Sequence, residues 1–123
     1  MVILITGKAG AGKTHYSKEL AKELIDQGEK VVVLDGDELR DQTGNKDFTD
    51  KGREENLRKA ADLAAEFERD GFTVICAFIA PTAKFRYMMR KYWKKSRVIY
   101  IPGGTLWEGT SYETPSWVEM DAQ

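Results

Sequence analysis

The chain has 123 residues, a length that suits one domain built around a single core. Its 19 Lys and Arg side chains nearly balance its 20 Asp and Glu side chains, so overall charge singles out no class of partner. One cysteine excludes a disulfide within the chain, and Cys76, set in the apolar run 73–79, is expected to be a buried, inert thiol. We recognise no secretory signal and no apolar run long enough to cross a membrane, so we expect a reducing, cytoplasmic location.

The first predicted strand, residues 2–6, leads directly into a phosphate-binding sequence. Residues 7–14 read Gly-Lys-Ala-Gly-Ala-Gly-Lys-Thr, which matches the P-loop pattern G-x-x-x-x-G-K-[ST], and helical spacing follows over 13–27. Backbone N–H groups of such a loop and the start of the helix attract phosphate oxygens. Lys13 would stabilise the β- and γ-phosphates of ATP, and the Thr14 hydroxyl would bind Mg²⁺. The expected cofactor-binding residues are Gly7, Ala9, Gly10, Ala11, Gly12, Lys13 and Thr14.

The second predicted strand, residues 30–35, ends in a cluster of charged side chains. Asp35 is its last residue, and Asp37 and Arg40 follow within five positions. A carboxylate there could complete the Mg²⁺ shell or orient an attacking hydroxyl, and an arginine could hold an oxyanion with two hydrogen bonds. The alternative is a polar turn that caps a short helix.

A mixed segment of aromatic, basic and amide side chains precedes and enters the next predicted helix, residues 53–70. Phe48 could stack on a planar ring, Arg53 and Arg58 could bind acidic groups, and Asn56 could donate hydrogen bonds. That combination suits a planar, anionic ligand.

Two further strands, over 73–79 and 97–101, flank a third predicted helix over 82–95. The strands are rich in Val and Ile without polar alternation, as in strands buried on both faces of a parallel sheet. The β–α alternation predicts an α/β, three-layer P-loop NTPase fold, with a mainly parallel sheet of four or five strands flanked by helices. Residues 1–123 would form one domain, with an irregular segment over 102–123. Ligands of such sheets bind at the carboxyl ends of the strands.

The stretch from 71 to 107 contains no Asp or Glu and is rich in Lys and Arg. It would favour phosphates on a nucleotide, a small substrate or nucleic acid, or it could be a solvated helix face. Arg86 and Arg90, four positions apart, could supply positive charge to the site.

Taken together, these motifs resemble those of the adenylylsulfate (APS) kinases. Besides the P-loop, residues 34–40 and then 45–48 and 53–58 are similar to the family's L-D-G-D-x-x-R, N-K-D-L-G-F-S and D-R-x-E-N-I-R-R. Residues 107–109 and 112–115 are similar to its F-T-G-I and Y-E-x-P. The resemblance covers nearly the whole chain, with gaps.

The resemblance implies ATP-dependent phosphorylation of the 3′-hydroxyl of APS, which gives PAPS and ADP. Asp37 matches the family's catalytic carboxylate, and Lys13 would act with it in catalysis. The implied substrate-binding residues are Asp37, Arg40, Phe48, Arg53, Asn56 and Trp107. Phe48 and Trp107 fall where the family stacks aromatic rings.

The chain also departs from the family pattern. Gly52 stands where the family has Asp, and Ala80 replaces the serine of its I-S-P-Y sequence. The family's lid, with its R-D-P-K-G-L-Y segment, is missing between Gly104 and Trp107. A lid excludes water and positions the nucleotide, so its loss bears on adenine recognition, on closure and on the choice of acceptor.

Two alternatives therefore stay open. The chain could phosphorylate another nucleotide or a nucleic-acid hydroxyl, with the basic stretch holding phosphates. It could also be a nucleotide-binding module without turnover. A homodimer is possible, because a second copy could cover Trp107 and the tail.

Overall fold

A computed structural model of the chain describes residues 1–36, 50–105 and 111–121. Its centre is a sheet of four parallel strands: β1 (Val2–Thr6), β2 (Val31–Asp35), β3 (Thr73–Ala77) and β4 (Ser96–Tyr100). The strand order is β2–β3–β1–β4, so β1 is hydrogen-bonded on both sides. The predicted parallel sheet is confirmed, with four strands in the described part of the chain.

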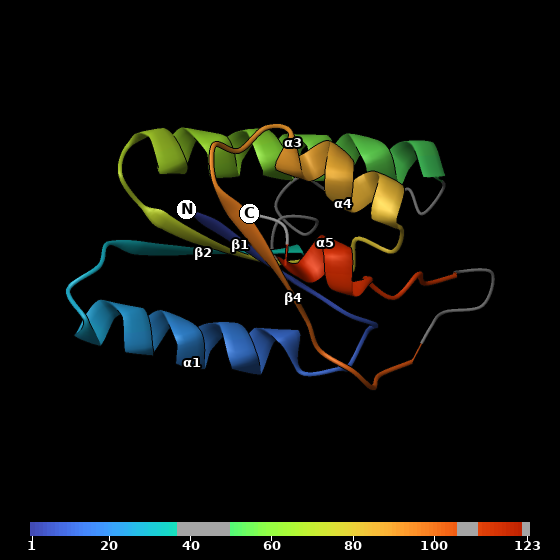
Figure 1. Cartoon of the computed structure of the whole chain (residues 1–123), viewed down its shortest axis with the longest axis horizontal. Helices are drawn as coiled ribbons and strands as arrows, with labels where there is room; N and C mark the ends of the chain where they lie inside the picture. The colour runs from blue at the N-terminus through green and yellow to red at the C-terminus, as the bar shows by residue number, and fades with distance from the viewer. Residues whose placement is uncertain (37–49, 106–110, 122–123) are drawn as a thin grey trace.

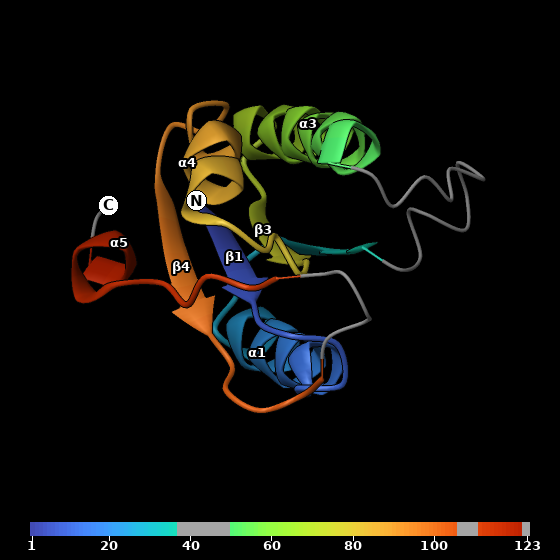
Figure 2. The ribbon, with the colours of Figure 1, turned by 90° about the vertical axis from the view of Figure 1, so that its right-hand side faces the viewer.

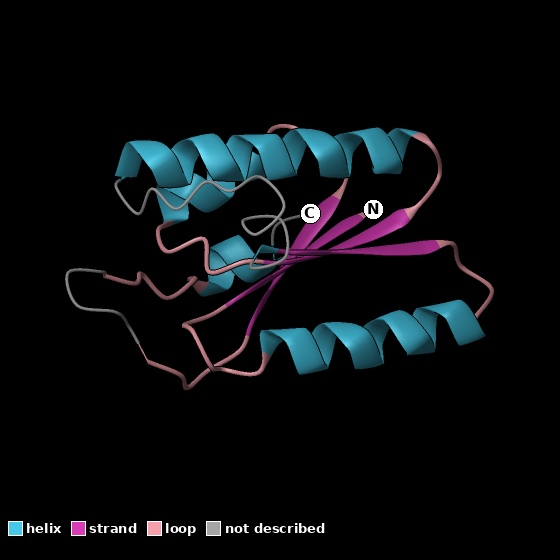
Figure 3. Cartoon of the chain, turned by 180° about the vertical axis from the view of Figure 1, so that it is seen from behind, coloured by secondary structure: helices cyan, strands magenta, loops and turns pink. Residues whose placement is uncertain are grey.

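Helices cover both faces of the sheet, which makes three layers (Figures 1 and 3). Helix α1 (Lys13–Asp26) covers one face, and α3 (Asp50–Arg69) and α4 (Ala83–Arg90) cover the other. A short helix, α5 (Trp117–Asp121), packs beside the edge strand β4 (Figure 2). The three-layer α/β architecture predicted from the alternation of elements is therefore confirmed.

Side chains of β1 divide the core into two parts. Val2 and Leu4 belong to the cluster packed under α3 and α4, whereas Ile5 belongs to the cluster packed against α1. All three are fully buried, as expected where successive residues of a central strand point to opposite faces. Cys76 on β3 is also fully buried, and its burial raises the pKa of the thiol, so the expectation of an inert cysteine is supported.

Two expectations for the second half of the chain were wrong. The third helix ends at Arg90, not at 95. Beyond it, the backbone N–H groups of Tyr92 and Trp93 each donate to the carbonyl three residues earlier, which closes a turn. This turn places Trp93 in the core, where its indole N–H donates to the Ala61 carbonyl at 2.9 Å. The segment after 102 was predicted to be irregular throughout, yet it contains α5. The Ser116 hydroxyl accepts from the backbone N–H of Glu119 at 3.2 Å and so begins this helix.

The carboxylate of Glu68, near the end of α3, ties this helix to the turn before β4. It accepts from the backbone N–H groups of Lys94 and Lys95 at 2.8 and 3.1 Å, and the amino group of Met1 lies 3.1 Å away. Burial alone would raise the pKa of Glu68, but these donors outweigh it and lower that pKa below its usual value.

We predict that Glu68→Gln lowers the free energy of unfolding by about 1–2 kcal/mol at pH 7. A carboxyl whose pKa is depressed in the folded state stabilises above its ordinary pKa, near 4.3, and loses that effect as the pH falls through the folded value. Urea unfolding from pH 7 to pH 2 should therefore show that the difference in free energy of unfolding between Glu68→Gln and wild type shrinks below about pH 4. Glu66→Gln, on an exposed position of the same helix, is the control. A gap that stays constant with pH would contradict this role of Glu68.

Candidate active site

The site lies at the carboxyl ends of two neighbouring strands whose following helices pack on opposite faces of the sheet. β1 leads into α1 on one face, and the adjacent β3 leads into α4 on the other. Such a switch point opens a crevice at the carboxyl ends of the strands, where ligands of open α/β sheets bind. A cavity of about 740 Å³ occupies this position. Its described walls come from the P-loop, the start of α1, the ends of β2 and β3, and residues 53–63 of α3.

The P-loop has the backbone shape that its glycines allow. Gly12, at the start of α1, has φ 101°, in the left-handed region that favours glycine. Lys13 Nζ donates to the carbonyls of Gly7 and Lys8 at 3.0 and 2.8 Å, so the ammonium lies back over the loop itself. Ala9, Gly10, Gly12, Lys13 and Thr14 line the cavity. The arrangement can present backbone N–H groups and the Lys13 ammonium to a phosphate.

Thr14 is joined to Asp35, which belongs to the charged cluster at the end of the second strand but is not among the predicted site residues. Its Oγ1 donates to Asp35 Oδ2 at 2.8 Å, which links the start of α1 to the end of β2. A hydroxyl and a carboxylate in contact at the edge of a phosphate loop are suitable oxygen ligands for Mg²⁺. The signal that could have singled out Asp35 is its place as the last residue of a buried parallel strand.

The far wall of the cavity is formed by α3 and the ends of two strands. Arg53 and Asn56 line it, together with the apolar residues Leu57, Ala60 and Leu63 one to two turns later. The structure thus brings these two predicted substrate residues into the same cavity as the P-loop. Apolar area beside a few polar groups is typical of small-molecule sites.

The charge of the described lining residues favours an anion. The basic side chains on the described wall are Lys13, Lys18, Arg53 and Lys59. Asp35 is the one carboxylate among the described lining residues. This balance suits a ligand with several negative charges, such as a nucleotide or a sulfated nucleotide.

The segment after β4 returns across the P-loop. The backbone N–H of Thr105 donates to the Ala9 carbonyl at 2.8 Å, and that of Ile101 donates to the Thr6 carbonyl at 2.9 Å. Gly104, at φ 78°, lies so close that a Cβ there would be 2.5 Å from the Ala9 carbonyl oxygen. Gly103 and Gly104, both at positive φ, allow the chain to pack directly on the phosphate loop.

Four predicted site residues, Asp37, Arg40, Phe48 and Trp107, lie outside the described residues. Their roles remain predictions. Among the described residues, no group of three or more His, Cys, Asp or Glu side chains could hold a metal ion. None of the described helices is long and apolar enough to cross a membrane.

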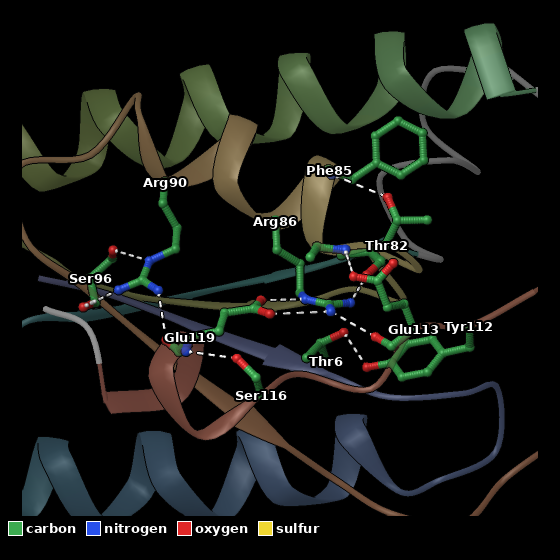
Figure 4. Close-up of polar contacts among 12 residues, drawn as sticks. Thr6, Thr82, Phe85, Arg86, Arg90, Ser96, Tyr112, Glu113, Ser116 and Glu119 are labelled. Atoms are coloured by element: carbon green, nitrogen blue, oxygen red, sulfur yellow. Dashed lines mark hydrogen bonds and ion pairs between the residues drawn. The ribbon is translucent and has the colours of Figure 1, made fainter.

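The prediction that Arg86 and Arg90 supply charge to the site was wrong. Arg86 is fully buried and paired with Glu119, and Arg90 donates to Ser96 and to the Glu119 carbonyl (Figure 4). Both guanidinium groups face α5 because that helix provides the acceptors. The basic stretch therefore contributes fewer charges to the surface than its sequence suggests, and this weakens the nucleic-acid alternative.

Comparison with known proteins agrees with this geometry. The sequence pattern of the family described as "Adenylylsulphate kinase" matches residues 1–103. A probable adenylyl-sulfate kinase of Bacillus subtilis is 39% identical over 92 residues, covering 73% of this chain and 46% of that protein. An adenylyl-sulfate kinase of Paraburkholderia xenovorans is 42% identical over 91 residues, covering 73% and 51%.

A solved structure is similar over the same region. The Mycobacterium tuberculosis APS kinase in complex with AMPPNP and APS superposes with a TM-score of 0.77 at 27% identity, covering 82% of this chain and 61% of that one. The chain thus spans about half the length of the curated relatives it matches. The P-loop, the parallel sheet and the match over residues 1–103 together show that the chain belongs to the adenylylsulfate kinase family.

Proposed function

We propose that the chain transfers the γ-phosphoryl group of ATP to the 3′-hydroxyl of APS, giving PAPS and ADP. The observation that carries the proposal is a single cavity shared by two sets of residues. The P-loop lines one wall, and Arg53 and Asn56, which match the family's acceptor site, line another. A transferase for these two substrates needs both sets within reach of one reacting phosphoryl group.

The proposed reaction is an in-line displacement at the γ-phosphorus. The acceptor oxygen forms a bond to phosphorus, the bond to the β–γ bridging oxygen breaks, and the hydroxyl proton leaves toward a base. Asp37, two residues beyond β2, is the proposed base or orienting carboxylate. The protein contributes mainly position and charge to such a transfer.

Lys13 is the proposed source of positive charge at the transferring group. Its ammonium now donates to two loop carbonyls, which are weaker acceptors than phosphate oxygens. A nucleotide phosphate in the loop would draw these hydrogen bonds to itself, and the lysine would then offset charge on the β- and γ-phosphates.

Thr14 and Asp35 are the residues that would hold Mg²⁺ with the nucleotide. Their oxygens lie 2.8 Å apart, and both are ligands that this hard cation accepts. When bound, the ion neutralises phosphate charge. The residues' own part is to keep a hydroxyl and a carboxylate together at the edge of the P-loop.

The first test is ADP release from Mg-ATP with and without APS. Wild type should show APS-stimulated release, Lys13→Met should lower kcat by about 10²–10³, and Asp37→Ala should abolish the stimulation. Nucleotide binding without APS-stimulated ADP release would agree with the fold and would contradict APS as the acceptor. Binding without turnover on any acceptor would favour the non-catalytic alternative.

The second test separates the acceptor from the nucleotide. Arg53→Ala should raise KM for APS by about tenfold, because a charge-assisted hydrogen bond is lost, while KM for ATP stays within about twofold. Arg69→Ala, at the opposite end of the same helix, is the matched control and should change neither constant. An equal rise of both constants in Arg53→Ala would contradict an acceptor-side role.

The third test concerns Asp35. Asp35→Asn keeps the shape of the side chain and removes its charge, so half-maximal AMPPNP binding should need about tenfold more Mg²⁺. Binding of the nucleotide without Mg²⁺ should not weaken. A uniform loss of affinity with and without Mg²⁺ would contradict this role for Asp35.

A further inference from the structure

Arg86 is a fully buried cation that holds three separate parts of the chain (Figure 4). Its Nε and Nη2 pair with the carboxylate of Glu119 on α5, where the acid is also buried. Nη1 donates to the Ala80 carbonyl at 2.7 Å, and Nη2 donates to the Glu113 carbonyl at 2.6 Å. The planar guanidinium thus donates four hydrogen bonds, which join the loop after β3 to two neighbouring positions of the C-terminal segment, Glu113 and Glu119.

One of these loops is a wall of the cavity. Residues 79–81, which follow β3 and are called the rim below, line the cavity beside the P-loop and α3. Ala80 has φ 41°, an uncommon conformation for a residue other than glycine. Such a conformation persists only where surrounding contacts determine it, and the hydrogen bond from Arg86 to the Ala80 carbonyl is one of them.

A second set of contacts ties the rim to residues 112–113. Thr6 Oγ1 donates to the Ile79 carbonyl, so the Tyr112 hydroxyl, 2.9 Å from Thr6 Oγ1, is the donor in that contact. The backbone N–H of Glu113 donates to the Pro81 carbonyl at 2.7 Å. The Glu113 carboxylate accepts from the backbone N–H of Ala83 at 3.3 Å.

The two sets meet at the Tyr112 ring. The Arg86 guanidinium carbon lies 5.6 Å from the centre of this ring, close enough for a cation–π contact in a desolvated place. The carbonyls of the three successive rim residues, Ile79, Ala80 and Pro81, each accept a hydrogen bond from this network. A loop that follows a strand and would otherwise be a free connection is therefore fixed at every residue.

We propose that Arg86 is a positioning residue for the acceptor, acting with a C-terminal clasp formed by Tyr112, Glu113 and Glu119 that sets the shape of the rim. The proposal rests on the proposed function for its acceptor. The residues of the clasp do not line the cavity, so the effect reaches the ligand only through the rim. Because β3 lies between β2 and β1, the rim sits between Asp35 and the P-loop, where the acceptor must meet the nucleotide.

The test uses the full chain and two variants. Tyr112→Phe removes the hydrogen bond to Thr6 and keeps the ring under Arg86. Arg86→Met combined with Glu119→Met removes both buried charges together, so neither is left without a counterion. Far-UV circular dichroism and thermal unfolding establish that each variant is folded at the assay temperature.

Two readouts are measured on each variant. Native-state hydrogen exchange of the Ala83 amide, which donates to the Glu113 carboxylate, and of the Glu113 amide, which donates to the Pro81 carbonyl, reports on the rim and is called rim exchange below; it should accelerate by roughly tenfold. KM for APS should rise by about five- to tenfold, while kcat and the Kd for Mg-AMPPNP stay within about twofold.

The matched control is Val74→Ala, a fully buried position at the opposite end of β3. It destabilises the core without touching the rim, so it should lower the unfolding temperature and leave rim exchange and KM for APS as in wild type. Variants of the clasp that lose stability but match this control in both readouts would overturn the proposal.

The readouts also separate this proposal from the proposed function. If wild type shows no APS-dependent turnover, the proposed function fails, and rim exchange still decides whether the clasp holds the rim. Unchanged rim exchange in both variants would overturn the clasp whatever the substrate is.

Discussion

The hydrogen bonding of β1 on both edges is the constraint on which the rest of the structure depends. Because β3 and β4 flank it, β1 starts and ends inside the sheet, and its Val2, Leu4 and Ile5 are fully buried. Gly7 to Thr14 therefore emerge from the hydrogen-bonded, buried centre of the sheet. A phosphate loop must hold its N–H groups in fixed directions, and a central strand provides that fixed base.

Two segments after β4 extend this fixed base to the rest of the site. Residues 101–105 pack on the phosphate loop through the Thr105–Ala9 hydrogen bond. Residues 112–119 pack on the rim beyond β3 through Arg86 and Tyr112. Both segments thus make short direct contacts to the two loops that wall the cavity.

Much of the fold could be predicted from the sequence because its signals are local. The apolar run before the P-loop, the helical spacing after it and the Val- and Ile-rich strands each identify an element without reference to distant residues. The features that were missed depend on contacts between residues far apart. The end of α4 depends on the hydrogen bond between the Trp93 indole and the Ala61 carbonyl. The position of α5 depends on the pairing of Glu119 with Arg86, 33 positions earlier.

The candidate site shows the same division. Lys13, Thr14, Arg53 and Asn56 were predicted from motif and resemblance, and the structure brings them to one cavity. Arg86 was misread because an i, i+4 pair of arginines looks the same whether it faces solvent or a buried acid. Asp37 was predicted as a site residue and the pairing of Asp35 with Thr14 was not, since only the folded chain shows that these two side chains lie 2.8 Å apart.

Calorimetric titration of the chain with Mg-AMPPNP and with APS tests the central claim, that one cavity holds nucleotide and acceptor side by side. We expect one site for each ligand on each chain, and APS binding that persists when the chain is saturated with Mg-AMPPNP. Displacement of APS by Mg-AMPPNP would mean that the two ligands compete for the same subsite, and it would contradict a transfer between them.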